Sequence, residues 1–130
     1  MSFLRPINAK SLFRPAGPNY IPARDVEATA AWYIEKFDLR RISVELDDGE
    51  NCVALSFSKQ EEDLAFVVGP AGVPTDGSTP MLNASNLDRA RDLLSSRGVN
   101  VDDIRQDRQG THFFEMRDLE GNVTEISEEP

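Results

Sequence analysis

Glu125, in a short strand-like run near the C-terminal end, is the residue best suited to chemistry. Val123 and Glu125 alternate with Thr124 and Ile126, so Glu125 shares one strand face with Val123. If that face looks into the domain, the carboxylate needs a cation, a hydrogen-bond donor or water, because burying a lone charge is costly. Such a group can act as a base or as a ligand contact. The plainer alternative is a solvated glutamate near the end of a strand.

The single histidine and the single cysteine are weaker candidates. His112 and Phe114 lie two residues apart and therefore share a face of the preceding strand. His112 is either a rim residue or a polar contact to a ligand, since histidine titrates near neutrality. Cys52 has no second cysteine to pair with, and its apolar neighbours favour a small buried thiol over a nucleophile.

Composition limits the classes of partner. A chain of 130 residues is one domain's worth, and 23 acidic against 14 basic residues give a net charge of −9. Because nucleic-acid binding needs clustered Lys and Arg, this charge argues against it. No apolar run is long enough for a membrane span or a signal peptide, so we expect a cytoplasmic protein.

The chain contains an internal repeat. Asp25 and Asn86 each sit where a helix should begin, and they are 61 residues apart; at the same offset Tyr33 matches Leu94. Each half predicts a strand, a helix and three strands. The expected strands are residues 19–24, 41–46, 51–58 and 64–68 in the first half and 81–84, 99–104, 113–116 and 123–127 in the second.

These patterns predict a single α+β domain over residues 1–130, built from two βαβββ modules. Module 1 covers about residues 18–69, a Pro- and Gly-rich linker covers residues 70–79, and module 2 covers about residues 80–128. We expect a pseudo-symmetric arrangement in which the two sheets face each other and leave a cleft. Residues 1–18, which three prolines interrupt, are expected to form an arm packed either on the domain or on a partner subunit.

Two segments resemble the vicinal oxygen chelate superfamily. The first runs from Ile21 to Ala28 and is followed by Trp32 and Tyr33; the second is the closing hairpin, residues 114–126. Leu119 stands where the family usually has proline. The superfamily covers glyoxalases, extradiol dioxygenases, fosfomycin-resistance enzymes and bleomycin-resistance proteins, so the resemblance implies a fold more firmly than an activity.

The resemblance also implies four positions for metal ligands. In this chain they fall on Pro18, Thr79, the neighbourhood of Phe66, and Glu125. Only Glu125 is an ordinary ligand, and a stable divalent site needs about three protein ligands. We therefore expect no metal cofactor.

By resemblance, the first hypothesis is a metal-independent small-molecule-binding protein of the antibiotic-resistance kind, working as a homodimer. It would sequester a cationic or aromatic compound in a cleft lined by Trp32, His112, Phe114 and Glu125, with Trp32 otherwise packing as helix core. The second is a metal-dependent lyase or isomerase of the glyoxalase type, or a dioxygenase, with Ni, Zn, Mn or Fe and with Glu125 as ligand or base. The third is an accessory protein without a small ligand.

Overall fold

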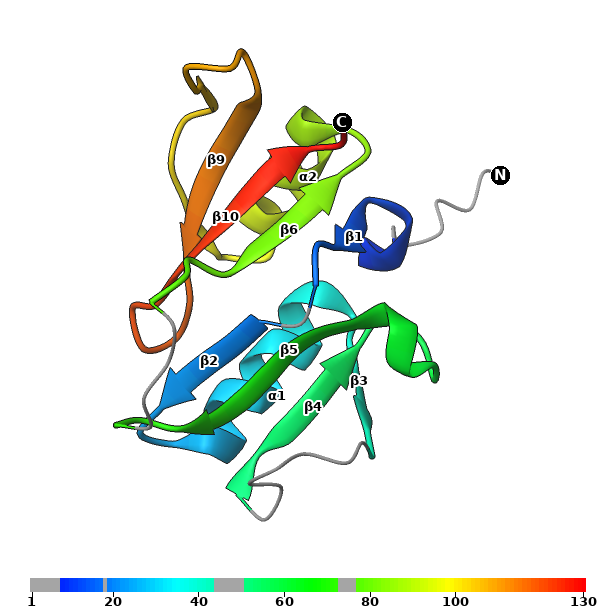
Figure 1. Ribbon diagram of the computed structural model, residues 1–130, viewed down its shortest axis with the longest axis vertical. Helices are drawn as coiled ribbons and strands as arrows, with labels where there is room; N and C mark the ends of the chain where they lie inside the picture. Colours follow the sequence, from blue (N-terminus) through cyan, green and yellow to red (C-terminus); the bar gives the residue numbers. More distant parts are fainter. Residues whose placement is uncertain (1–7, 18, 44–50, 73–76) are drawn as a thin grey trace.

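The computed structural model describes residues 8–17, 19–43, 51–72 and 77–130. These residues form two sheets (Figure 1). The N-terminal sheet has the strand order β2 (Asn19–Ala23), β5 (Leu64–Pro70), β4 (Val53–Ser56) and β3 (Arg40–Ile42). The C-terminal sheet has the order β1 (Phe13–Pro15), β6 (Met81–Ala84), β10 (Val123–Glu128), β9 (His112–Arg117) and β7 (Asn100–Val101), and β8 (Arg105–Gln106) also pairs with β9. The α+β prediction is confirmed.

Each sheet is covered on one face by its own helix. Helix α1 (Val26–Phe37) begins where the Asp25 carboxylate accepts a hydrogen bond from the backbone N–H of Ala28 at 3.0 Å. Helix α2 (Leu87–Ser96) begins in the same way, with the Asn86 side chain accepting from Arg89 N at 3.1 Å. The described residues also include the 3-10 turns η1 (Ala9–Ser11) and η3 (Glu61–Asp63).

The two sheets do not pack face to face. Figure 1 shows them one above the other, with α1 and α2 both behind them. Because each sheet buries its apolar face under its own helix, neither needs the other sheet as a cover. We call the face of each sheet opposite its helix the open face. The expectation of two sheets facing each other is therefore corrected.

The N-terminal arm joins the sheet of the second half. Strand β1 runs antiparallel to β6, and Ala9, Leu12 and Phe13 are all buried. The Phe13 ring packs edge-on against Phe37 of α1, with centroids 5.2 Å apart. Of the two alternatives for the arm, the described part therefore packs on its own domain.

Equivalent residues of the repeat hold the two halves together. Lys36 Nζ donates to the Arg97 carbonyl at 2.7 Å, and Arg97 Nη1 donates to the Lys36 carbonyl at 2.8 Å. At the junction of the sheets, the Asn19 side chain donates to the Met81 carbonyl at 2.9 Å and accepts from Met81 N at 3.1 Å. A side-chain amide thus imitates a strand partner between β2 and β6.

The sequence predicts a hairpin turn at residues 118–122, because Gly121 and Asn122 tolerate positive φ and Asp118 can hydrogen-bond its own backbone two residues on; this turn lies between β9 and β10. Its register pairs Arg117 with Val123, and the Asp118 carboxylate accepts from the backbone N–H groups of Glu120 and Asn122, both at 2.9 Å. Asp118 is buried, so these bonds also satisfy a charge that has little contact with water.

This turn docks on the first half. The two Glu120 oxygens accept from the backbone N–H groups of Arg24 at 2.8 Å and Asp25 at 2.9 Å, just before α1 begins. Asp118 Oδ2 accepts from the Tyr33 hydroxyl at 2.6 Å. Burial and then the Asp118 charge raise the pKa of Tyr33 well above its usual value. The turn is therefore a structural clasp between the modules.

The other expected strands agree only in part with the structure. Strand β3 covers the start of the expected strand 41–46, and residues 44–46 lie outside the described residues, as does the hairpin turn that the Asp and Gly residues of positions 47–50 predict. The expected strand 99–104 is reduced to β7, and β8 was not expected. Among the described residues, no helix is long and apolar enough to cross a membrane.

Candidate functional site

Glu125 points to the open face of the C-terminal sheet. Its strand neighbours Thr124 and Ile126 are both fully buried on the α2 side, so Glu125 must face the other way. The Ser127 hydroxyl donates to Glu125 Oε2 at 3.0 Å. The predicted alternation of this strand is confirmed.

A second carboxylate lies directly across the ladder. Glu115 of β9 is the register partner of Glu125, and Met81 is the partner of Glu125 on the β6 side. Like charges directly opposite on antiparallel strands destabilise a sheet. We call Glu115 and Glu125 the carboxylate pair. Phe113 lies two residues from Glu115 on the same face and is partly buried.

An arginine occupies the corner beside this pair. Arg105 Nη2 lies 2.8 Å from Glu115 Oε1 and 3.0 Å from Asp102 Oδ2. Its guanidinium carbon is 5.0 Å from the centroid of the Phe113 ring. The hydrogen bond to Glu115 is the main cause that raises the pKa of Arg105, and the charge of Glu125 adds to it. With three carboxylates around one guanidinium, this part of the face stays negative.

The four residues predicted to line one cleft do not converge. Phe114 is fully buried in the core, where a surface ligand cannot reach it. Trp32 lies in the helix layer, with its ring edge-on to Tyr33 at 5.0 Å. His112 begins β9 and meets Glu128: its backbone N–H donates at 2.9 Å and its Nδ1 lies 3.2 Å from the same oxygen. Of the four predicted residues, Glu125 is the one that lies on the open face of the C-terminal sheet.

The residues that do accompany Glu125 are Phe113, Glu115 and Arg105, and none of them is among the four residues predicted to line the cleft. A signal for two of them was present. The turn at Asp118 fixes the hairpin register, and that register puts Glu115 opposite Glu125 and Phe113 on the same face. Arg105 had no comparable signal, because it reaches the face through the separate short strand β8.

The positions that the superfamily uses for metal ligands do not supply a donor set. In the register, Tyr20 pairs with Val67 just as Met81 pairs with Glu125, so Val67 is the first-half counterpart of Glu125, one residue beyond the expected Phe66. Val67 has no donor atom. Thr79 is exposed, and Pro18 lies outside the described residues.

Side chains next to these positions do not supply the missing metal ligands. Asn19, the best alternative next to Pro18, has its amide engaged with Met81 and with the Ala65 carbonyl at 3.1 Å. In the part of the chain that the structure describes, no three His, Cys, Asp or Glu residues gather as a metal site. The donor chemistry therefore does not fit a resident divalent ion.

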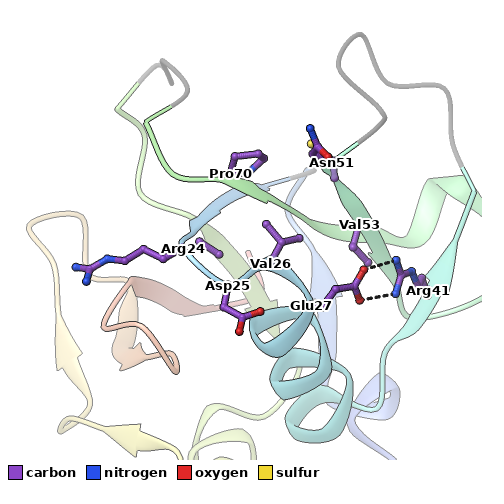
Figure 2. Close-up of a pocket in the computed structure, with 10 residues that line it drawn as sticks. Arg24, Asp25, Val26, Glu27, Arg41, Asn51, Val53 and Pro70 are labelled. Carbon is purple, nitrogen blue, oxygen red and sulfur yellow. Dashed lines mark hydrogen bonds and ion pairs between the residues drawn. The ribbon is translucent and has the colours of Figure 1, made fainter.

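A separate hollow of about 520 Å³ lies at the start of α1 (Figure 2). Ala23 and Val53, two of its lining residues, are buried. Arg41 binds Glu27 through two hydrogen bonds of 2.8 and 2.9 Å. Arg41 thereby lowers the pKa of Glu27. Arg24 points away from the hollow in Figure 2. The hollow thus has an ion pair whose charges already compensate each other.

Several known structures share this fold. A glyoxalase/bleomycin resistance protein/dioxygenase superfamily member from Sphaerobacter thermophilus aligns with a TM-score of 0.63 and 20% identity, over 86% of this chain and 94% of that one. The bleomycin resistance determinant encoded on transposon Tn5 gives a TM-score of 0.64 and 15% identity, over 86% and 95%. A lactoylglutathione lyase from Agrobacterium tumefaciens gives 0.60 and 17%, over 88% and 94%.

This chain has the fold of the glyoxalase/bleomycin resistance/dioxygenase superfamily, as its two sequence segments predicted. No protein-family model and no curated protein matches the sequence. Identities of this size establish the fold alone, and the activity has to be argued from the site.

Proposed function

We propose that the protein binds a small cationic molecule with an aromatic part, without a metal, on the open face of the C-terminal sheet. The observation that carries this proposal is the carboxylate pair. Glu115 and Glu125 face each other across β9 and β10, an arrangement that costs the fold stability. A charge arrangement that the fold does not need is a candidate for ligand binding.

The neighbours of the pair suit such a ligand. A cation would be attracted by Glu125 and Glu115, and its aromatic part would stack on Phe113. Met81 adds a flexible, polarizable surface beside Glu125. The shared fold with a bleomycin resistance determinant supports sequestration of a toxic compound as the biological role.

The same resemblance leads us to expect a homodimer, which light scattering would test. The alternative of a metal-dependent lyase, isomerase or dioxygenase is less well supported. It needs a donor set that Thr79, Val67 and Glu125 do not supply.

The test is a titration with proflavine, a planar aromatic cation, followed by fluorescence and calorimetry. Glu125→Gln keeps the shape and removes one charge, so we expect affinity to fall about fivefold to tenfold. Glu27→Gln makes the same charge change on α1 and should leave affinity unchanged. Equal affinity in the wild type and Glu125→Gln would contradict the proposed site.

Metal independence is tested separately. Metal content of the purified protein and titration with nickel, zinc and manganese should give no stoichiometric tight binding. Tight binding of one ion per chain would overturn the metal-free proposal and direct attention to glyoxalase-type and dioxygenase substrates.

A further inference from the structure

The corner between Phe113 and the carboxylates already holds a cation. The Arg105 guanidinium lies over the Phe113 ring at 5.0 Å and donates from one nitrogen to both Glu115 and Asp102. The protein's own side chain therefore shows which kind of group fits there: a planar cation that stacks on the ring and carries N–H donors for two carboxylates.

Arg105 is held weakly. Its side chain is 50% exposed and that of Glu115 is 38% exposed. Exposed ion pairs and exposed cation–π contacts each contribute little, because water competes for both partners. Glu125 accepts a hydrogen bond from Ser127, and its charge lies close enough to Arg105 to affect it. Arg105 donates hydrogen bonds to two carboxylates, Glu115 and Asp102. A ligand cation that also reached Glu125 would engage a third.

The local fold does not depend on the Arg105 side chain. Asp102 Oδ1 accepts from Glu115 N at 2.7 Å, and Asp102 N donates to the Glu115 carbonyl at 3.0 Å. These bonds attach the segment before β8 to β9 by themselves. Movement of the guanidinium away from Phe113 therefore leaves the sheet intact.

We propose that the ligand group recognised on this face is a planar, N–H-bearing cation, such as a guanidinium or an amidinium, and that Arg105 is the resident competitor it displaces. This inference rests on the proposed function, since it specifies the ligand class of the same open face. It makes Arg105 a determinant of specificity, because only a cation that exceeds its hold on Phe113, Glu115 and Asp102 can bind.

The experiment compares two probes of similar size on four proteins. Benzamidine is a planar cation with N–H donors, and benzyltrimethylammonium is a cation without them. The proteins are the wild type, Arg105→Gln, Glu125→Gln and a control, Arg41→Gln, which removes an arginine from a similar two-bond ion pair on β3. Affinity is measured by calorimetry, and circular dichroism checks that each variant is folded.

For Arg105→Gln we expect benzamidine to bind about fivefold to tenfold more tightly, which is the size of the weak contacts that Arg105 gives up. Arg41→Gln makes the same change in net charge and should leave its affinity at the wild-type value. Benzyltrimethylammonium should gain less than about twofold from Arg105→Gln, because it cannot donate to Glu115 or Asp102.

The outcomes separate the two proposals. If benzamidine binds and Glu125→Gln weakens it, while Arg105→Gln behaves like Arg41→Gln, the site stands and the competitor role is overturned. If only Arg105→Gln binds benzamidine, the competitor role stands and the wild-type binding function falls. If no protein binds either probe, both proposals fall. A gain for benzyltrimethylammonium as large as that for benzamidine would overturn the N–H requirement.

Discussion

The open faces of the two sheets differ at equivalent positions. On the N-terminal sheet these positions hold Tyr20, Val67 and Ala54, and on the C-terminal sheet they hold Met81, Glu125 and Glu115. Val67 is only 9% exposed and Ala54 only 3%, although neither belongs to the core around α1. Small, nearly buried apolar side chains occupy the first face, while two opposed carboxylates occupy the second.

The surroundings of each face show the same contrast. Tyr20 lies over Gly69 and donates its hydroxyl to the Pro70 carbonyl at 3.0 Å, so a side chain at Gly69 would collide with Tyr20 and with Cys52. That face is packed for stability. The carboxylate pair has no such packing, and Arg105 engages it from an exposed position. The two modules thus share one architecture, but the open face of the N-terminal sheet carries packed apolar side chains and that of the C-terminal sheet carries charged ones.

The most damaging way to break this contrast is Val67→Glu, which puts the charge of Glu125 into the equivalent position of the packed face. A nearly buried carboxylate should lower the free energy of unfolding by about 3 kcal/mol or more, because taking a charge out of water is costly. Urea denaturation measures it. Val67→Gln is the matched control, because it adds similar volume without charge. A loss below about 1 kcal/mol for Val67→Glu would show that the face is open to water.

The next largest effect concerns the clasp. Tyr33→Phe removes the 2.6 Å hydrogen bond to buried Asp118 Oδ2, which then keeps its 3.0 Å hydrogen bond from the Asn122 side-chain amide. We expect a loss of about 1–3 kcal/mol in urea denaturation. Tyr20→Phe removes a hydroxyl that donates to a neutral carbonyl, so its loss should be about 1 kcal/mol or less. Equal losses would mean that the hydrogen bond between Tyr33 and Asp118 contributes no more to stability than the one between Tyr20 and a neutral carbonyl.

The clasp shows how much of the fold could be predicted from sequence. The turn at Asp118 and the caps Asp25 and Asn86 were predicted because their signals are local, a residue type at a fixed offset. That Asp118 reaches Tyr33 was not predicted, since the two are 85 residues apart. Strand β1 was missed for the same reason: Pro15 argues against a strand, and the pairing with β6 is long-range.

The site illustrates the same limit. Alternation shows that Phe113 and Phe114 lie on opposite faces, but it does not say which face is covered by a helix. The burial of Ile126 decides this: its register partner is Phe114, so Phe114 joins the core and Phe113 stays with Glu125. The role of Arg105 was beyond the sequence, because β8 is only two residues long.

A smaller effect on stability is expected for Glu120, a carboxylate that stabilises the fold and does not belong to the carboxylate pair. The backbone N–H groups of Asp25 and Arg24 lower the pKa of Glu120 from 4.5. A depressed pKa means that Glu120 stabilises the fold above pH 4.5, and that this contribution is lost as the pH falls through the folded-state value.

Glu120→Gln should therefore destabilise the protein at neutral pH and lose most of that difference from the wild type in acid. Urea denaturation at a series of pH values measures it. Leu119→Ala, an exposed change in the same turn without a titrating group, should shift stability equally at every pH. A Glu120→Gln difference that does not shrink in acid would contradict the role given to these backbone donors.

The smallest expected change in stability, and the sharpest test of the contrast, is Glu125→Val, which gives the open face of the C-terminal sheet the residue type of its N-terminal counterpart. If the carboxylate pair serves binding, the stability of the fold should not depend on Glu125. Removing one of two opposed like charges then leaves the free energy of unfolding within about 0.5 kcal/mol of the wild type, or slightly higher. Binding of proflavine should still fall by at least the amount expected for Glu125→Gln. A clear loss of stability with unchanged binding would instead make Glu125 a structural residue, and the difference between the two faces would then be a difference in packing alone.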